Sequence, residues 1–170
     1  FNSNKNTYLT KVVVTAQHRE MLDQVLDVFE IVPDFDLNLM SKNQSLESLT
    51  ARILNSISEI IKKLNPDLVF VQGDTTTTFG AALAAFYQGV TVAHLEAGLR
   101  TKNIYSPFPE EVNRRITSII SSYHFSPTEK SKKNLVNEGI NKEKIYVIGN
   151  TVIDAILSVS KKLDQDQKNF

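Results

Sequence analysis

The chain has 170 residues, a length typical of a single domain, and 41% of them are hydrophobic while 22% are charged, as in an ordinary globular protein. Its 19 basic residues balance its 19 acidic ones, so no net charge attracts nucleic acid or an anionic membrane, and we expect neither as a partner. The absence of cysteine excludes disulfides and thiolate metal sites, and because no apolar run reaches the ~20 residues of a membrane span and no signal peptide is visible, the predicted location is cytoplasmic.

Strand-like and helix-like segments alternate along the chain. Short apolar runs rich in β-branched residues predict strands, and apolar residues spaced three and four apart predict helices. The strands are expected at 11–16, 67–72, 90–96, 123–126 and 144–148, with a short strand-like stretch within 33–40, and the helices at 18–29, 46–64, 79–87, from Pro109, from a cap at Ser126, and from 151 into a polar tail at 164–169. This alternation predicts an α/β fold, a doubly wound parallel sheet with helices on both faces.

The stretch from Pro66 to Thr78 has the strongest signal for a functional site. The run 67–72 is typical of a buried parallel strand, and it is followed by the turn Gly73-Asp74 and four threonines that lead into a helix. Open α/β sheets bind their ligands at the carboxyl ends of the strands, where this turn lies. The plainer interpretation is that Asp74 or Thr75 caps the helix, but one cap does not explain a glycine, a carboxylate and four hydroxyls together.

Three carboxylates are expected at this edge of the sheet. Asp74 follows one strand, Glu96 ends the next, and Glu110 lies in the first turn of the helix after that. Carboxylates held close together raise one another's pKa, so that one can donate a proton while another accepts one. Such a set suits proton transfer at carbon or glycosidic chemistry. For Glu110 the alternative is that its charge only stabilises a helix N-terminus.

Arg114 and His94 each have two interpretations. Arg114 lies one helical turn after Glu110, on a helix whose apolar stripe is expected to face the core and to turn Arg114 toward water or a cleft. In water the two residues form a solvated ion pair, whereas in a cleft Arg114 becomes a phosphate clamp. His94 is interpreted as a core residue of its strand rather than a catalyst. The apolar stripe consists of Val112, Ile116 and Ile119.

The sequence contains none of the common cofactor motifs. No G-x-G-x-x-G follows a strand, and there is no Walker loop, no G-x-S-x-G and no paired-histidine zinc spacing. We therefore expect no cofactor and no metal.

Three segments carry a resemblance to a known family: Gln72–Thr78, His94–Thr101 and Tyr105–Arg114. Two shorter segments, Val14–Leu22 and Ile148–Ala155, support it, so that the likeness covers roughly residues 11–157. On these motifs the chain resembles the N-terminal domain of the non-hydrolysing UDP-N-acetylglucosamine 2-epimerases.

The resemblance implies a glycosyltransferase-B architecture, in which two Rossmann-like domains enclose the active site, and a homodimer. It implies that UDP-GlcNAc and UDP-ManNAc are interconverted without NAD or metal, by elimination and re-addition of UDP through a glycal, to supply ManNAc for cell-surface polysaccharide. By motif position, Asp74, Glu96 and Glu110 are the catalytic residues. The residues expected to bind the substrate are Arg114, Gly73 and Thr75.

Compared with that family, the chain is interpreted as a fragment. It starts at Phe1 rather than methionine, and it lacks the family's first strand and its second domain. Residues 1–157 are assigned to the N-terminal domain, incomplete at its start, and 158–170 to a helix end and a linker towards the absent C-terminal domain. We therefore expect the isolated chain to have negligible epimerase activity.

The resemblance leaves regulation and the reaction outcome open. Gln17 and His18 lie where bacterial members bind a second UDP-GlcNAc as activator, and they are candidates for allosteric contacts, although Glu20 and Asn43 differ from residues of some relatives. The alternative functions are a hydrolysing epimerase, a transferase of the same architecture, and a truncated, non-enzymatic remnant that binds nucleotide sugar weakly or not at all.

Overall fold

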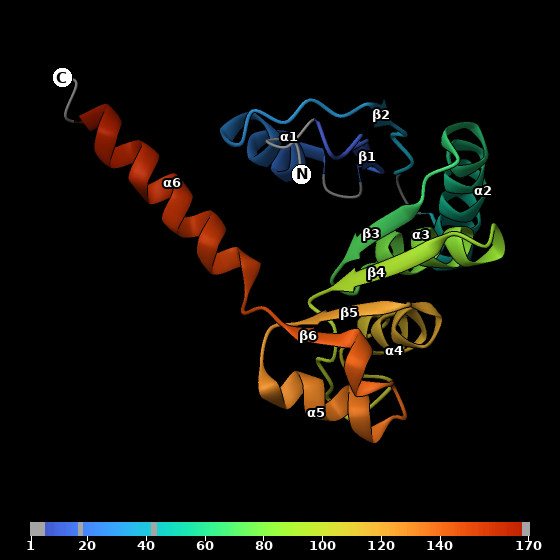
Figure 1. The fold of residues 1–170 in the computed structure, drawn as a ribbon. Coiled ribbons are helices and arrows are strands. Elements are labelled where there is room, and N and C mark those ends of the chain that lie inside the picture. Colours follow the sequence, from blue (N-terminus) through green and yellow to red (C-terminus); the bar gives the residue numbers. More distant parts are fainter. Residues whose placement is uncertain (1–5, 17–18, 42–43, 168–170) are drawn as a thin grey trace. The chain divides into compact units, whose positions relative to one another are not determined.

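The computed structural model describes residues 6–16, 19–41 and 44–167, with side chains through residue 162. The chain divides into two compact units, Phe1–Arg52 and Ile53–Phe170 (Figure 1). Among the described residues, no helix has the length and the apolar character that a membrane crossing requires.

The first unit contains a two-stranded parallel sheet, in which Val13 lies opposite Phe35. The strand predicted at 11–16 is shorter in the structure, where it comprises Val13–Val14. Before it, the Val12 N–H donates to the Asp34 carboxylate (2.8 Å) instead of to a strand. After it, Ala16 has a left-handed φ of +58° that ends the extended backbone. The helices predicted at 18–29 and 46–64 are confirmed. The elements are β1 (Val13–Val14), α1 (Arg19–Val28), β2 (Phe35–Asp36) and the start of α2 (Leu46–Leu64).

The second unit contains a four-stranded sheet in the order β3-β4-β5-β6, in which every neighbouring pair is parallel (Figure 1). The predicted α/β fold with a parallel sheet is therefore confirmed. The strands are β3 (Leu68–Gln72), β4 (Thr91–Leu95), β5 (Tyr123–Ser126) and β6 (Ile145–Val147). The helices are α3 (Thr76–Tyr87), α4 (Glu110–Ile120), α5 (Glu129–Asn137), the 3-10 turn η1 (Lys142–Lys144) and α6 (Thr151–Gln167).

Two helix ends differ from the sequence-based expectation. Thr128, rather than Ser126, caps α5, since its hydroxyl accepts the Ser131 N–H (3.1 Å), while Ser126 is fully buried at the end of β5. Helix α6 continues through Gln167, so most of the expected polar tail is helical.

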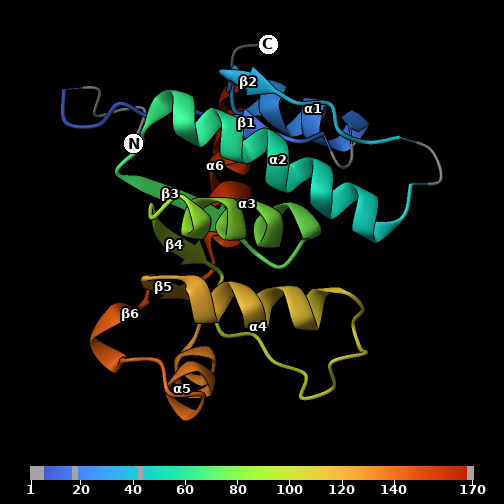
Figure 2. The ribbon, with the colours of Figure 1, turned by 90° about the vertical axis from the view of Figure 1, so that its right-hand side faces the viewer.

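Helices α3, α4 and α5 lie on one face of the four-stranded sheet. Three residues that point to this face, Val71, His94 and His124, are at most 7% exposed. Helix α3 runs beside α4 (Figure 2), and Leu135 of α5 packs against Ile145 of β6.

The opposite face of the same sheet is only partly covered in the described chain. Because side chains alternate along a strand, β3 is not fully buried as predicted, and Leu68 and Phe70 point to this face. The Phe125 ring stacks with those of Phe70 and Tyr146, at centroid distances of 6.1 and 5.5 Å. The large residues of this face, Leu68, Phe70, Tyr123 and Tyr146, are 37–46% exposed.

The buried face of α4 is polar, which contradicts the predicted apolar stripe. Ile119 is 74% exposed, whereas Glu111, Arg114 and Ser118, spaced three and four apart, are at most 9% exposed. The polar face is buried because α4 covers polar groups. The backbone carbonyl of Ser118 accepts a hydrogen bond from His124 Nε2 (2.9 Å), and Glu111 and Arg114 contact polar groups near the end of the sheet. Periodicity correctly predicted a helix here but selected the wrong face.

Candidate functional site

The site is built around the turn that follows β3. Gly73 has a φ of +74°, which a side chain would strain, and its N–H donates to the Leu95 carbonyl of β4 (3.0 Å). Thr75 is the N-cap of α3, since its hydroxyl accepts the Thr78 N–H (3.2 Å). The cap interpretation therefore holds for Thr75 but not for Asp74, and the Asp74 carboxylate remains available for other contacts.

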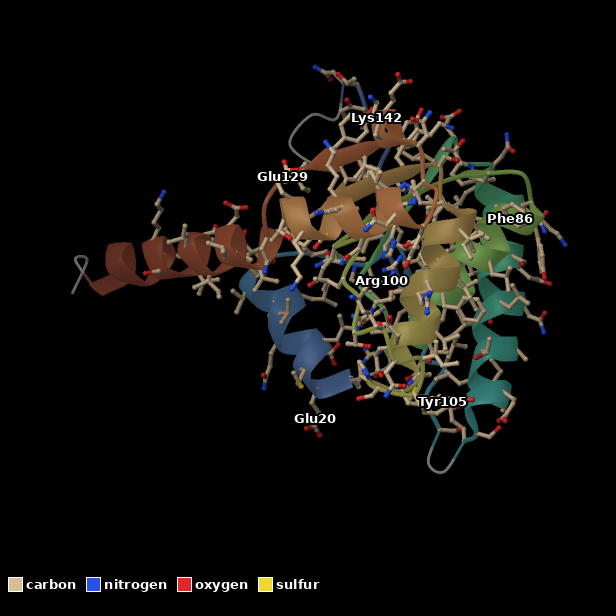
Figure 3. The ribbon with its side chains drawn as sticks, turned by 90° about the horizontal axis from the view of Figure 1, so that it is seen from below. Glu20, Phe86, Arg100, Tyr105, Glu129 and Lys142 are labelled. Atoms are coloured by element: carbon tan, nitrogen blue, oxygen red, sulfur yellow. The ribbon has the colours of Figure 1, made fainter. Side chains whose placement is uncertain are left out.

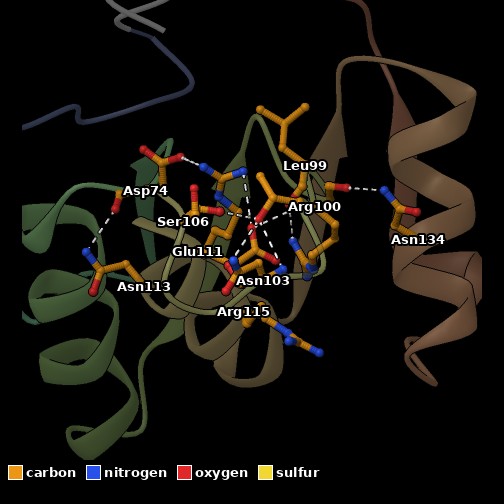
Figure 4. A network of polar contacts seen from close by, with 12 residues as sticks. Asp74, Leu99, Arg100, Asn103, Ser106, Glu111, Asn113, Arg115 and Asn134 are labelled. Atoms are coloured by element: carbon orange, nitrogen blue, oxygen red, sulfur yellow. Dashed lines mark hydrogen bonds and ion pairs between the residues drawn. The ribbon is translucent and has the colours of Figure 1, made fainter. Parts of the chain in front are cut away.

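Arg114 of α4 binds the Asp74 carboxylate. Its Nη2 lies 2.6 Å from Asp74 Oδ2, and its Nη1 lies 3.5 Å from Glu111 Oε2 (Figure 4). The Arg114 side chain is 11% exposed, against 28% for Asp74 and none for Glu111. Arg114 is therefore a buried counter-ion shared by two carboxylates rather than a solvated partner of Glu110, and its contact with the substrate stays a prediction.

Glu96 completes a close group with Asp74 and Arg114. It ends β4 with a left-handed φ of +63°, an uncommon conformation for a non-glycine residue that is held by the surrounding structure. Its Oε2 lies 3.3 Å from the position that a Cβ on Gly73 would occupy, so the carboxylate rests against the turn. Burial, and next the charge of Asp74, raise the pKa of Glu96, while Arg114 partly opposes this.

Glu110 is the first residue of α4 and is half-buried. Within the described part of the chain it forms no hydrogen bond or ion pair with Asp74 or Glu96. The structure thus brings together Asp74, Glu96 and Arg114, and it places Glu110 one helical turn before Arg114 without direct contact to the pair. Its catalytic role stays a prediction.

Sequence reasoning missed Glu111, the residue next to Glu110. Its carboxylate is fully buried and accepts the Thr101 N–H (3.1 Å), which joins the α4 network to the loop after β4 (Figure 4). The signal that pointed to it was its spacing of three from Arg114, which places both residues on one side of a helix.

Arg100 anchors the beginning of the same loop. Its guanidinium donates to both oxygens of Glu138 (2.8 Å each), to the Leu99 carbonyl and to Ser118 Oγ. The Arg100 side chain is only 4% exposed and lies among the interior side chains, whereas Tyr105, further along the loop, is 75% exposed (Figure 3).

His94 is a core residue, as interpreted from the sequence. Its Nε2 lies 2.7 Å from the Gly73 carbonyl, an acceptor, so this nitrogen carries the proton. Burial lowers the pKa of His94 to about 4, with the charges of His124, Arg100 and Arg114 acting in the same direction. The ring is therefore neutral at pH 7. In the described residues no group of three or more His, Cys, Asp or Glu side chains is arranged to hold a metal ion.

A family model described as UDP-N-acetylglucosamine 2-epimerase matches residues 2–170. The chain belongs to the UDP-N-acetylglucosamine 2-epimerase family. The resemblance carried by the motifs around Asp74, Glu96 and Glu110 is thereby confirmed.

Several members of the UDP-N-acetylglucosamine 2-epimerase family are closely similar to this chain. The enzymes of Neisseria meningitidis and Escherichia coli K12 are 58% and 54% identical to it, each over 93% of this chain and 42% of the relative. The crystal structure of the N. meningitidis enzyme bound to UDP-GlcNAc superposes with a TM-score of 0.91 and 56% identity, over 96% of this chain and 45% of that one. The Methanocaldococcus jannaschii enzyme in complex with UDP-GlcNAc and UDP has a TM-score of 0.84 and 38% identity, over 92% and 43% of the two chains. This chain thus spans about two fifths of the length of these epimerases.

The candidate allosteric residues, Gln17 and His18, lie outside the described residues. Their role stays a prediction.

Proposed function

We propose that this chain is the N-terminal part of a non-hydrolysing UDP-GlcNAc 2-epimerase, which interconverts UDP-GlcNAc and UDP-ManNAc. The observation that supports this most directly is the close group of Asp74, Glu96 and Arg114 at the carboxyl ends of β3 and β4, in a chain of this family. Open α/β sheets bind their ligands at such an edge.

The chemistry of the reaction explains why several carboxylates are needed. The C2 proton of the sugar is not next to a carbonyl, so direct removal is too slow. Breaking the C1–O bond to UDP first leaves an oxocarbenium-like C1, which makes the C2 proton acidic, and its removal gives a glycal. Inversion at C2 then requires protonation from the other face of the ring while UDP re-adds at C1, so acid and base groups must stand on both sides.

The environments of the two contacting carboxylates suit different roles. Asp74 is ion-paired with Arg114, which suits a carboxylate that accepts a proton. Glu96 has a raised pKa and makes no ion pair within the described residues, which suits a proton donor. Glu110, at the start of α4, is the third candidate for the other face of the sugar. The substrate is proposed to bind at Arg114, Gly73 and Thr75, with Arg114 also holding Asp74.

We infer a two-domain glycosyltransferase-B architecture in which a C-terminal domain, not part of this chain, completes the nucleotide site. The protein is proposed to be a cytoplasmic homodimer that provides ManNAc units for polysaccharide. The 170 residues alone are proposed to be inactive, because half of the cleft is missing.

The test is turnover of UDP-GlcNAc in D2O by the full-length protein, expressed from the complete reading frame that encodes this chain. We expect UDP-ManNAc with deuterium at C2, and a loss of about 10²–10⁴-fold in rate for Asp74→Asn, as for removal of an acid–base group. Free ManNAc plus UDP would identify a hydrolysing epimerase, and the absence of C2 exchange would refute the elimination mechanism. The 170-residue chain serves as the matched sample, and robust turnover by it alone would refute the two-domain assignment.

A further inference from the structure

Three successive carbonyl groups at the Asp74 turn each accept a hydrogen bond from a buried side chain. The donor groups come from α3, β4 and α4, and their residues are at most 6% exposed. The bonds are Thr78 Oγ1 to the Gln72 carbonyl (2.5 Å), His94 Nε2 to the Gly73 carbonyl (2.7 Å) and Asn113 Nδ2 to the Asp74 carbonyl (3.0 Å, Figure 4).

Two of these bonds join the turn to the other elements of the candidate site. His94 lies two residues before Glu96, so its bond to Gly73 ties the turn to the strand that ends in Glu96. Asn113 lies on α4 between Glu110 and Arg114, so its bond to Asp74 ties the turn to that helix. The three elements that carry the predicted catalytic carboxylates are thus connected through single side-chain-to-carbonyl bonds.

These bonds use the backbone of the turn and leave the Asp74 carboxylate to Arg114 and to a substrate. Proton transfer depends on such placement, because a displacement of about 1 Å can lower a rate roughly 10²-fold. Burial lowers the pKa of His94 to about 4, so its ring is neutral at pH 7, and the Gly73 carbonyl, an acceptor, keeps the single ring proton on Nε2.

We propose that Asn113 and His94 are positioning residues, which hold Asp74, Glu96 and Glu110 at the mutual distances that the epimerase reaction requires. This role rests on the proposed function. Neither residue acts on the substrate.

Asn134 provides a matched control for Asn113. Its Nδ2 donates to the Gly98 carbonyl (2.9 Å), so it makes the same kind of bond from α5, in the same unit but to a residue outside the carboxylate group. The experiment compares Asn113→Ala and Asn134→Ala in the complete reading frame, by kcat, KM and thermal midpoint. Carbonyl ¹³C shifts of Asp74 and Gly98, measured on the 170-residue chain, report directly whether each bond is lost.

We expect both variants to lose a similar, small amount of thermal stability. Only Asn113→Ala should lower kcat, by about 10–100-fold with KM within about twofold, because misplaced groups slow the chemical step more than binding. If Asn113→Ala keeps the kcat of wild type although the Asp74 carbonyl shift has moved, or if Asn134→Ala loses as much kcat, the positioning role is refuted. An inactive wild type would instead overturn the proposed function, and this role with it.

His94 is tested by a conservative rescue. His94→Gln keeps an N–H donor at a reach close to that of Nε2, whereas His94→Phe keeps the bulk and loses the donor. We expect His94→Gln to retain most of kcat and His94→Phe to lose it while staying folded by circular dichroism. Equal losses in the two variants would show that His94 contributes packing alone.

Discussion

Arg114 lies between two carboxylates that differ in exposure. Glu111 is fully buried, and a buried carboxylate is tolerated only when it has a partner. Arg114 is that partner, with its Nη1 3.5 Å from Glu111 Oε2. The same guanidinium lies 2.6 Å from Asp74. One positive charge is thus divided over two carboxylates, so Glu96 stands beside an incompletely neutralised Asp74.

This arrangement predicts opposite effects of two substitutions on Glu96. Arg114→Gln removes a charge that stabilises the ionised form, so the pKa of Glu96 should rise, whereas Asp74→Asn removes a like charge, so the pKa of Glu96 should fall. Side-chain ¹³C titration of Glu96 in the 170-residue chain measures both.

The control for that titration is Arg115→Gln, because Arg115 is 42% exposed and its nearest carboxylate, on Glu138, is 3.9 Å away. Arg115→Gln should leave the pKa of Glu96 unchanged. A shift of the same sign in Arg114→Gln and Asp74→Asn would contradict the electrostatic account.

The packing of α3 depends on small residues. Ala82, Ala84 and Ala85 are fully buried, and Gly80 faces Ile53 of α2 so closely that an added Cβ would lie 2.7 Å from Ile53 Cγ2. This lack of side-chain volume allows α2 to approach α3, and α3 in turn is packed beside α4.

Gly80→Ala should therefore destabilise the protein, although the same change at an exposed helix interior stabilises by about 1 kcal/mol. We expect a loss of about 1–3 kcal/mol in the free energy of unfolding, typical of an overpacked core, measured by urea denaturation. Ile53→Leu in combination, which removes the Cγ2 methyl, should recover part of it. A stabilised single variant would show that α2 moves away from α3 at little cost.

At the scale of the whole molecule, the parallel sheet buries two histidines next to each other. His94 and His124 are register partners on β4 and β5, at most 1% exposed, with Arg100 among the charges that act on both. Burial lowers the pKa of His94 to about 4, and it also lowers the pKa of His124. In mild acid the folded protein therefore favours the neutral form of both rings, whereas the unfolded chain binds a proton on each.

The consequence is a loss of stability in mild acid. Because the folded pKa lies below the unfolded value near 6.5, the unfolded state binds the proton first, and stability falls as pH decreases from about 6.5 toward 4. For His94 alone we expect about 2 kcal/mol less free energy of unfolding at pH 5 than at pH 7.5, measured in urea. His94→Gln should show a correspondingly smaller pH dependence, and an unchanged one would contradict this assignment.

The amino-acid sequence alone determined the order of the elements, the parallel α/β fold and the family. These follow from local patterns: the β-branched runs at 67–72 and 90–96, the apolar residues spaced three and four apart in 46–64, and the glycine turn before Asp74. The placement of Asp74 and Glu96 at one edge also followed, because parallel strands end on the same side of a sheet.

Only the tertiary structure decided which face of α4 is buried and what holds Asp74. Apolar periodicity predicts burial of Val112, Ile116 and Ile119, but a polar face becomes buried when its partners come from elsewhere in the chain. Here Arg114 and Asn113 both contact Asp74, and Glu111 accepts the Thr101 N–H. No local pattern encodes such pairs, because the favourable energy of each contact exists only once distant segments have been brought together by folding.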